Sequence, residues 1–185
     1  MSKQPDNAPD VATVFPKLIG ALEAQLELPR GILLSLLEQS DWELVIKASV
    51  VAEVALGEAI QRALTSADRE QITEKINQGL GPKIKVAKRF ALLSREQCDY
   101  LWELSTMRNA CVHDRKGLSF TFSSYLRDRA NLASFRRRLG TLKSHPGHSA
   151  PELPETFLTP AAAVMARVSQ VCLALLMKPT RTRTH

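Results

Sequence analysis

The sequence is poor in cysteine and has neither a long apolar run nor a start that resembles a leader. Its three cysteines, Cys98, Cys111 and Cys172, are widely separated and include no C-x-x-C pair, which argues against a disulfide framework. The longest apolar run, residues 171–177, is far shorter than the roughly 20 residues that a membrane-spanning helix requires. Residues 1–10 lack a basic stretch followed by an apolar one, so a secretory signal is not expected. These absences predict a reduced, cytoplasmic protein that does not associate with a membrane.

Several catalytic signatures are also missing. The sequence contains no glycine-rich phosphate loop and no G-x-S-x-G turn. Of its four histidines, His145 and His148 lie in a proline-rich segment without an accompanying cysteine or carboxylate cluster, so a metal site there is the weaker interpretation. We therefore expect neither a metal nor a cofactor.

Basic charge, by contrast, is present and is concentrated in two places. The 25 lysines and arginines exceed the 19 acidic residues by 6, and residues 127–143 alone hold six basic residues and one acidic one. Residues 176–185 add three more basic residues. This distribution is typical of a protein that binds a polyanion, with RNA or DNA first and an acidic protein second, although a solvated helix face with a frayed terminus gives the same pattern. Arginines 136–138 fan over about 200° of a helix, so they do not all share one face. The residues expected to bind nucleic acid are Arg129, Arg136, Arg137 and Lys143.

The hydrophobic pattern predicts an all-α bundle. Apolar residues recur with helical spacing, and no pair of strands is convincing. The expected helices span residues 11–28, 31–39, 42–64, 69–77, 83–91, 95–113, 124–142 and 161–177. Gly79 to Pro82 is expected to break the chain, and residues 117–122 to be extended or a turn. The expected organisation is a disordered segment 1–10, N-terminal helices 11–39 packed on the bundle, a main helical domain 40–178 and a basic flexible tail 179–185.

The helix expected at 95–113 carries the most informative polar residues. Arg108 falls on its apolar stripe close to Leu101, so this charge needs either a partner in the fold or a second chain. His113 points about 140° away from it and is four residues past Asn109, whose amide can contact the imidazole. The structural alternative is an arginine that caps a neighbouring helix and a histidine that ends its own.

The order of motifs around this helix resembles a known family. The Arg-Asn-x-x-x-His element at 108–113 is similar to the Arg-polar-x(3–5)-His motif of HEPN domains. A lysine-bearing segment at 83–94 precedes it, and Gly-Leu-Ser-Phe at 117–120 and Pro-Glu-Thr-Phe at 154–157 follow it. This order resembles the mannitol-operon-repressor branch of HEPN-like helical proteins, and the resemblance covers about residues 40–178.

The resemblance implies a metal-independent endoribonuclease, built as a helical homodimer in which two motifs face each other. Toxin or defence systems, with an antitoxin or another regulatory partner, are the implied setting. The implied catalytic residues are Arg108 as a phosphate clamp, His113 as a general acid or base, and Asn109 as the residue that orients His113 or the phosphate. Cys111-Val112 departs from the aromatic and alanine usual in that branch, and Arg115 stands where one toxin subgroup has a tyrosine. The alternative, from another class, is a non-catalytic transcriptional regulator or interaction module with the same fold.

Three further residues allow two interpretations each. Glu53 sits among valines and alanines, where a carboxylate is more often a structural ion-pair member than a catalytic group. Cys111 is either a nucleophile beside a base or, more commonly, a small buried residue. Trp102 either stacks on a base of the nucleic acid or belongs to the core.

Overall fold

The computed structural model describes residues 11–64, 79–113, 117–139 and 159–177, and its fold is all-α. No strand occurs in these described ranges, which confirms the predicted fold class. The helices, in chain order, are α1 (Val11–Gln25), η1 (Leu34–Glu38), α2 (Asp41–Ala63), α4 (Leu80–Arg89), α5 (Arg95–His113), η2 (Gly117–Ser119), α6 (Phe122–Tyr125), α7 (Arg129–Leu139) and α8 (Pro160–Leu176).

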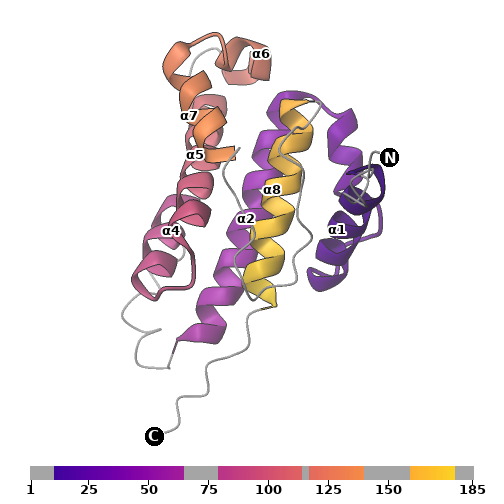
Figure 1. Ribbon diagram of the computed structural model, residues 1–185, viewed down its shortest axis with the longest axis vertical. Helices are drawn as coiled ribbons and strands as arrows, with labels where there is room; N and C mark the ends of the chain where they lie inside the picture. Colours follow the sequence, from indigo (N-terminus) through magenta and orange to yellow (C-terminus); the bar gives the residue numbers. More distant parts are fainter. Residues whose placement is uncertain (1–10, 65–78, 114–116, 140–158, 178–185) are drawn as a thin grey trace, which may run out of the picture.

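α8 lies at the centre of the bundle and is buried along most of its length. It packs mainly against α2 and α1, and less extensively against α5 and α7. Figure 1 shows the pair of α2 and α8 in the middle, α1 on one side, and α4, α5 and α7 on the other. Tyr100 of α5 donates a hydrogen bond of 3.0 Å to the carbonyl of Val164 on α8. The helices expected at 42–64 and 95–113 therefore both pack against the C-terminal helix.

The start of α4 differs from the prediction. Leu80, Gly81 and Pro82 were expected to break the chain, yet they form the first turn of α4. Proline is tolerated there because the N–H groups of a first turn have no partner inside the helix. The break is confined to Gly79, which has a φ of +98° that other residues rarely adopt.

The helix predicted at 124–142 is divided into two. α6 ends at Tyr125, and Asp128 then caps α7 by accepting hydrogen bonds from the backbone N–H groups of Ala130 and Asn131 at 2.8 and 3.0 Å. An aspartate that caps a helix stabilises a new start. The segment 117–122, which was expected to be extended or a turn, contains the short η2 and the first residue of α6.

Some predictions fall outside the described ranges. These are the helix at 69–77, the segment 154–157, the tail, and the residues Lys143, His145 and His148. Among the described helices, none combines the length and the apolar character needed to cross a membrane.

Candidate functional site

The candidate catalytic helix, α5, begins where the sequence predicts. Gln97 donates its backbone N–H to Oγ of Ser94 at 3.2 Å, and its side-chain oxygen accepts the N–H of Ser94 at 2.9 Å. This reciprocal capping box satisfies two backbone donors that the helix itself leaves unpaired. The inner face of α5 is buried through Leu101, Leu104 and Met107, which fixes the direction of the outer face.

The C-terminal turn of α5 is fixed by the N-terminal end of α2. The indole Nε1 of Trp42 donates to the carbonyl of Cys111 at 3.2 Å, two residues before His113. Asp41 accepts the N–H of Phe122 at 2.8 Å and so ties the segment that follows α5 to the same end of α2. Nothing in the local pattern around Trp42 signals this role, because its partner is 69 residues away in the chain.

The three motif residues occupy two sides of this helix end. Arg108 is half-buried, whereas Asn109 and His113 are exposed. Within the described ranges the side chains of all three lack a hydrogen bond or an ion pair, so the Asn109 amide does not form a hydrogen bond with the imidazole. The Asn109 amide and the His113 imidazole are both exposed, so water can form their hydrogen bonds instead.

α4 packs against both α2 and α5, but it is shorter than either helix and covers only part of the junction between them. A Cβ built on Gly81 would lie 4.0 Å from Oγ of Ser105, which shows how closely α4 approaches α5. On its other side, Nζ of Lys83 lies 3.1 Å from Oε1 of Glu53 on α2 and also donates to the Glu53 carbonyl at 3.3 Å. The structural interpretation of Glu53 is therefore the one observed.

Near the side on which α4 packs, α2 and α5 both carry exposed valines. Val112 is seven residues past Ser105 and so lies on the same side of α5, and Val50 is within about 60° of Glu53 on α2. The exposed fractions are 48% for Val112, 55% for Val50 and 46% for Val54. Arg108 lies next to Val112 on the helix surface, four residues earlier. We call the surface formed by Val50, Val54, Arg108 and Val112 the α2–α5 face.

Cys111 and Trp102 both take part in the packing. Burial raises the pKa of the Cys111 thiol to about 11, so it is protonated at neutral pH and is a poor nucleophile. The ring of Trp102 is half-buried against α4, where a Cβ on Gly81 would approach its Cζ3 within 3.5 Å.

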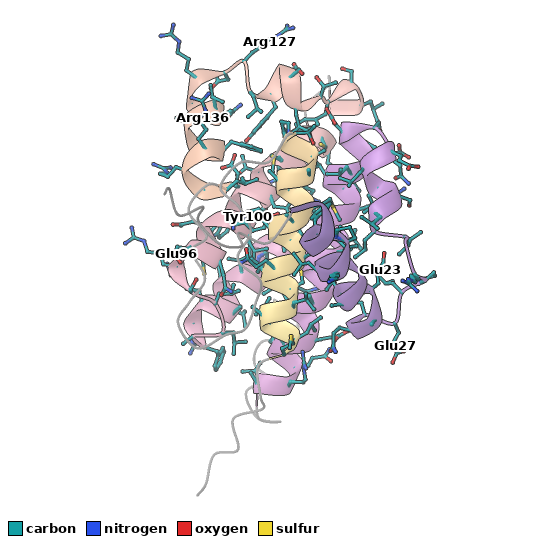
Figure 2. All side chains as sticks on the ribbon, turned by 45° about the vertical axis from the view of Figure 1, so that its right-hand side comes forward. Glu23, Glu27, Glu96, Tyr100, Arg127 and Arg136 are labelled. Atoms are coloured by element: carbon teal, nitrogen blue, oxygen red, sulfur yellow. The ribbon has the colours of Figure 1, made fainter. Side chains whose placement is uncertain are left out.

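The basic helix α7 has one arginine directed inward and three directed outward. Arg138 binds Glu103 of α5 at 3.0 Å, and the Glu103 carboxylate, which is 1% exposed, also accepts hydrogen bonds from Tyr125 and Ser134 at 3.0 and 2.7 Å. The outward residues are Arg129, Arg136 and Arg137. This agrees with the expectation that the arginines at 136–138 do not share a face. Figure 2 shows Arg127 and Arg136 at the end of the molecule that α6 and α7 form, away from Glu23 and Glu27.

A comparison of the chain with protein-family models, with curated proteins and with solved structures finds no match in any of the three. The functional argument therefore depends on the chain's own residues.

Proposed function

We propose that this protein is a metal-independent endoribonuclease of the HEPN type that acts as a homodimer. The observation that carries the proposal is the position of Arg108. It is a half-buried guanidinium without a partner in the described ranges, next to the exposed valines of the α2–α5 face. A charge on an apolar surface is costly unless something pairs with it, and both a second copy of the chain and an RNA phosphate would satisfy it.

The chemistry needs only groups that this helix end presents. The 2′-hydroxyl of RNA attacks the adjacent phosphorus and loses its proton, and the bond to the 5′-oxygen breaks as that oxygen gains a proton. An imidazole can perform either proton transfer near neutral pH, and His113 is exposed for this purpose. A guanidinium stays charged and binds phosphate oxygens through two N–H groups, which suits Arg108 to the developing negative charge.

A symmetric dimer explains why these two residues point apart. On one helix Arg108 and His113 diverge by about 140°, which is too far for both to reach the same phosphate. If two α2–α5 faces pack across a twofold axis, the Arg108 of each chain approaches the His113 of the other. The exposed valines then become buried, which supplies apolar area for association.

The first experiment measures cleavage of a generic RNA with EDTA present. We expect products that end in 2′,3′-cyclic phosphate, DNA that stays intact, and loss of most activity in both His113→Ala and Arg108→Ala, because residues that act as one unit are not additive. Activity that persists in His113→Ala, or that needs a divalent metal, would contradict the mechanism.

Mixing the two inactive variants tests the composite site. In a heterodimer of His113→Ala and Arg108→Ala, one of the two sites has an intact arginine from one chain and an intact histidine from the other. If subunits exchange freely, an equal mixture should regain about a quarter of the wild-type activity. A site contained within one chain would give no recovery.

The second candidate function is a non-catalytic regulator that uses the same dimer and the same basic helix. This alternative is favoured by the state of His113: its side chain is exposed, and within the described ranges no residue forms a hydrogen bond that would fix its tautomer for catalysis. A wild-type dimer that binds nucleic acid or a protein partner but cleaves no RNA would support the regulator.

A further inference from the structure

The outward face of α5 is a strip that two basic helices border. Glu103 turns toward α7, and Ser105 and Trp102 contact Gly81 of α4. On a helical projection these contacts leave an arc of about 130° of α5 uncovered between α4 and α7. The exposed or half-buried residues of this arc are Arg95, Asp99, Trp102, Thr106, Asn109, Ala110 and His113. We call this arc the α5 strip.

The border of the strip on the α4 side has its own row of positive charge. Lys85, Lys88 and Arg89 are exposed and fall within about 100° of one another, and α4 has no acidic residue. Lys88 is seven residues past Gly81 and so lies on the side of α4 that approaches α5. Consistent with this position, burial raises the pKa of the Cys98 thiol on α5 and the Lys88 charge partly offsets that shift. Neither Lys85 nor Lys88 forms an ion pair within the described ranges, so both charges are available to a ligand.

The border on the α7 side is also basic, because α7 has no acidic residue and carries three outward arginines. Among these arginines, the position of Arg137 on the helix places it nearest to the strip. Along the strip itself, Asp99 is near the N-terminal end of α5, and from Trp102 to His113 no exposed residue is acidic. From the level of Cys98, beside Lys88, to His113 the helix rises about 22 Å, a distance that several nucleotides can span.

We infer that the α5 strip is the path along which a single strand of RNA reaches His113, and that Lys85 and Lys88 of α4 bind its phosphates. The inference rests on the proposed function for its endpoint, because it takes His113 as the place of cleavage. RNA is favoured over an acidic protein because basic residues stand on both sides of a narrow strip that has no exposed acidic residue between Trp102 and His113. This arrangement matches a continuous phosphate backbone with sugars and bases between the edges.

The test measures binding rather than cleavage, so that failure of the nuclease proposal is distinguishable from failure of this one. Full-length protein with His113→Ala is titrated onto a fluorescent single-stranded RNA of mixed sequence at several salt concentrations, and anisotropy is recorded. Addition of Lys85→Glu and Lys88→Glu should weaken binding at least about tenfold at low salt. It should also reduce the slope of log K against log salt by about 1.4, since each lost phosphate contact on a single strand contributes about 0.7.

The matched control has the same change of charge on the far side of the molecule. Lys17 and Arg30 are exposed near α1, on the other side of the α2–α8 pair (Figure 1), so Lys17→Glu with Arg30→Glu should leave the salt slope unchanged. Equal behaviour of the two double variants would overturn the inference. Polyglutamate of matched charge is the competitor: if it displaces the RNA at equal charge concentration, the strip recognises an acidic polypeptide and the RNA assignment is wrong.

Discussion

Glu103 is the residue that joins the candidate catalytic helix to the basic helix. Its carboxylate is almost completely buried and accepts hydrogen bonds from Tyr125, Ser134 and Arg138. Arg138 therefore serves to attach α7, while Arg129 and Arg136 remain exposed for a ligand. A buried charge is tolerated in such a position only when its hydrogen-bonding capacity is fully used.

Removal of this carboxylate should destabilise the fold strongly. In Glu103→Ala, three buried or half-buried donors lose their acceptor, and Arg138 is left as an unpaired charge, so we expect a loss of about 3 to 5 kcal/mol in the free energy of unfolding. Urea denaturation followed by circular dichroism measures this loss. Glu96→Ala, an exposed change on the same helix, is the control and should shift stability by less than about 0.5 kcal/mol. A similar small shift for Glu103→Ala would show that the network contributes little.

Residues of the site were predictable to different degrees. Arg108 and His113 were identifiable because a charged residue on an apolar stripe and a histidine at a helix end are visible in local spacing. Trp42 and Glu103 were not, because their roles depend on partners 69 and 22 to 35 residues away in the chain. Helical periodicity assigns a residue to a face, but it does not say which distant element covers that face.

At the scale of elements, the starts of α2 and α5, each with a capping box, were predicted well. α5 has the predicted bounds, and α2 begins within one residue of the prediction, where Ser40 and Glu43 form a capping box. α4 begins three residues earlier than expected, because proline was taken as a breaker although it suits a first turn. The break between α6 and α7 was missed because the cap at Asp128 lies within a sequence that also suits one continuous helix.

Gly57, in the middle of α2, offers a stabilising substitution. An added Cβ would meet only Nζ and Cε of Lys83, at 3.7 and 3.9 Å, which is ordinary contact. Alanine loses less backbone entropy than glycine on folding, so Gly57→Ala should raise the free energy of unfolding by about 0.5 to 1 kcal/mol. Thermal and urea denaturation measure this change in the free energy of unfolding. The opposite sign is expected for Gly79→Ala, because its φ of +98° is strained for alanine. A destabilised Gly57→Ala protein would mean that Lys83 needs the space.

At the scale of the whole molecule, burial makes the fold sensitive to alkali. Every cysteine and tyrosine of the chain has a raised pKa, with burial as the largest cause; these residues are Cys98, Cys111, Cys172, Tyr100 and Tyr125. For Cys172 burial raises the pKa to about 12. The neutral forms are therefore favoured in the folded state, and the unfolded chain loses these protons first.

The resulting stability should be complete below about pH 9 and should fall as the pH rises above it. For Cys172 alone, the loss at pH 11 is about 2 to 3 kcal/mol. Urea midpoints recorded between neutral pH and pH 11, under reducing conditions, measure this dependence. Cys172→Ala removes one titrating group and should show a shallower decline than the wild type. Parallel curves for the two proteins would contradict the assigned contribution of this thiol.

Both tryptophans of the chain contact α5. Trp42 donates to the carbonyl of Cys111 near the end of the helix, and Trp102 packs beside α4 in the α5 strip. The tryptophan fluorescence of the protein therefore originates on or beside α5. A strand of RNA that settles on the strip should quench Trp102, whereas fraying of the last turn of α5 should shift the emission of Trp42 to longer wavelength. Replacement of one indole by phenylalanine separates the two signals, so one unlabelled variant reports occupancy of the strip and the other reports the order of the last turn of α5.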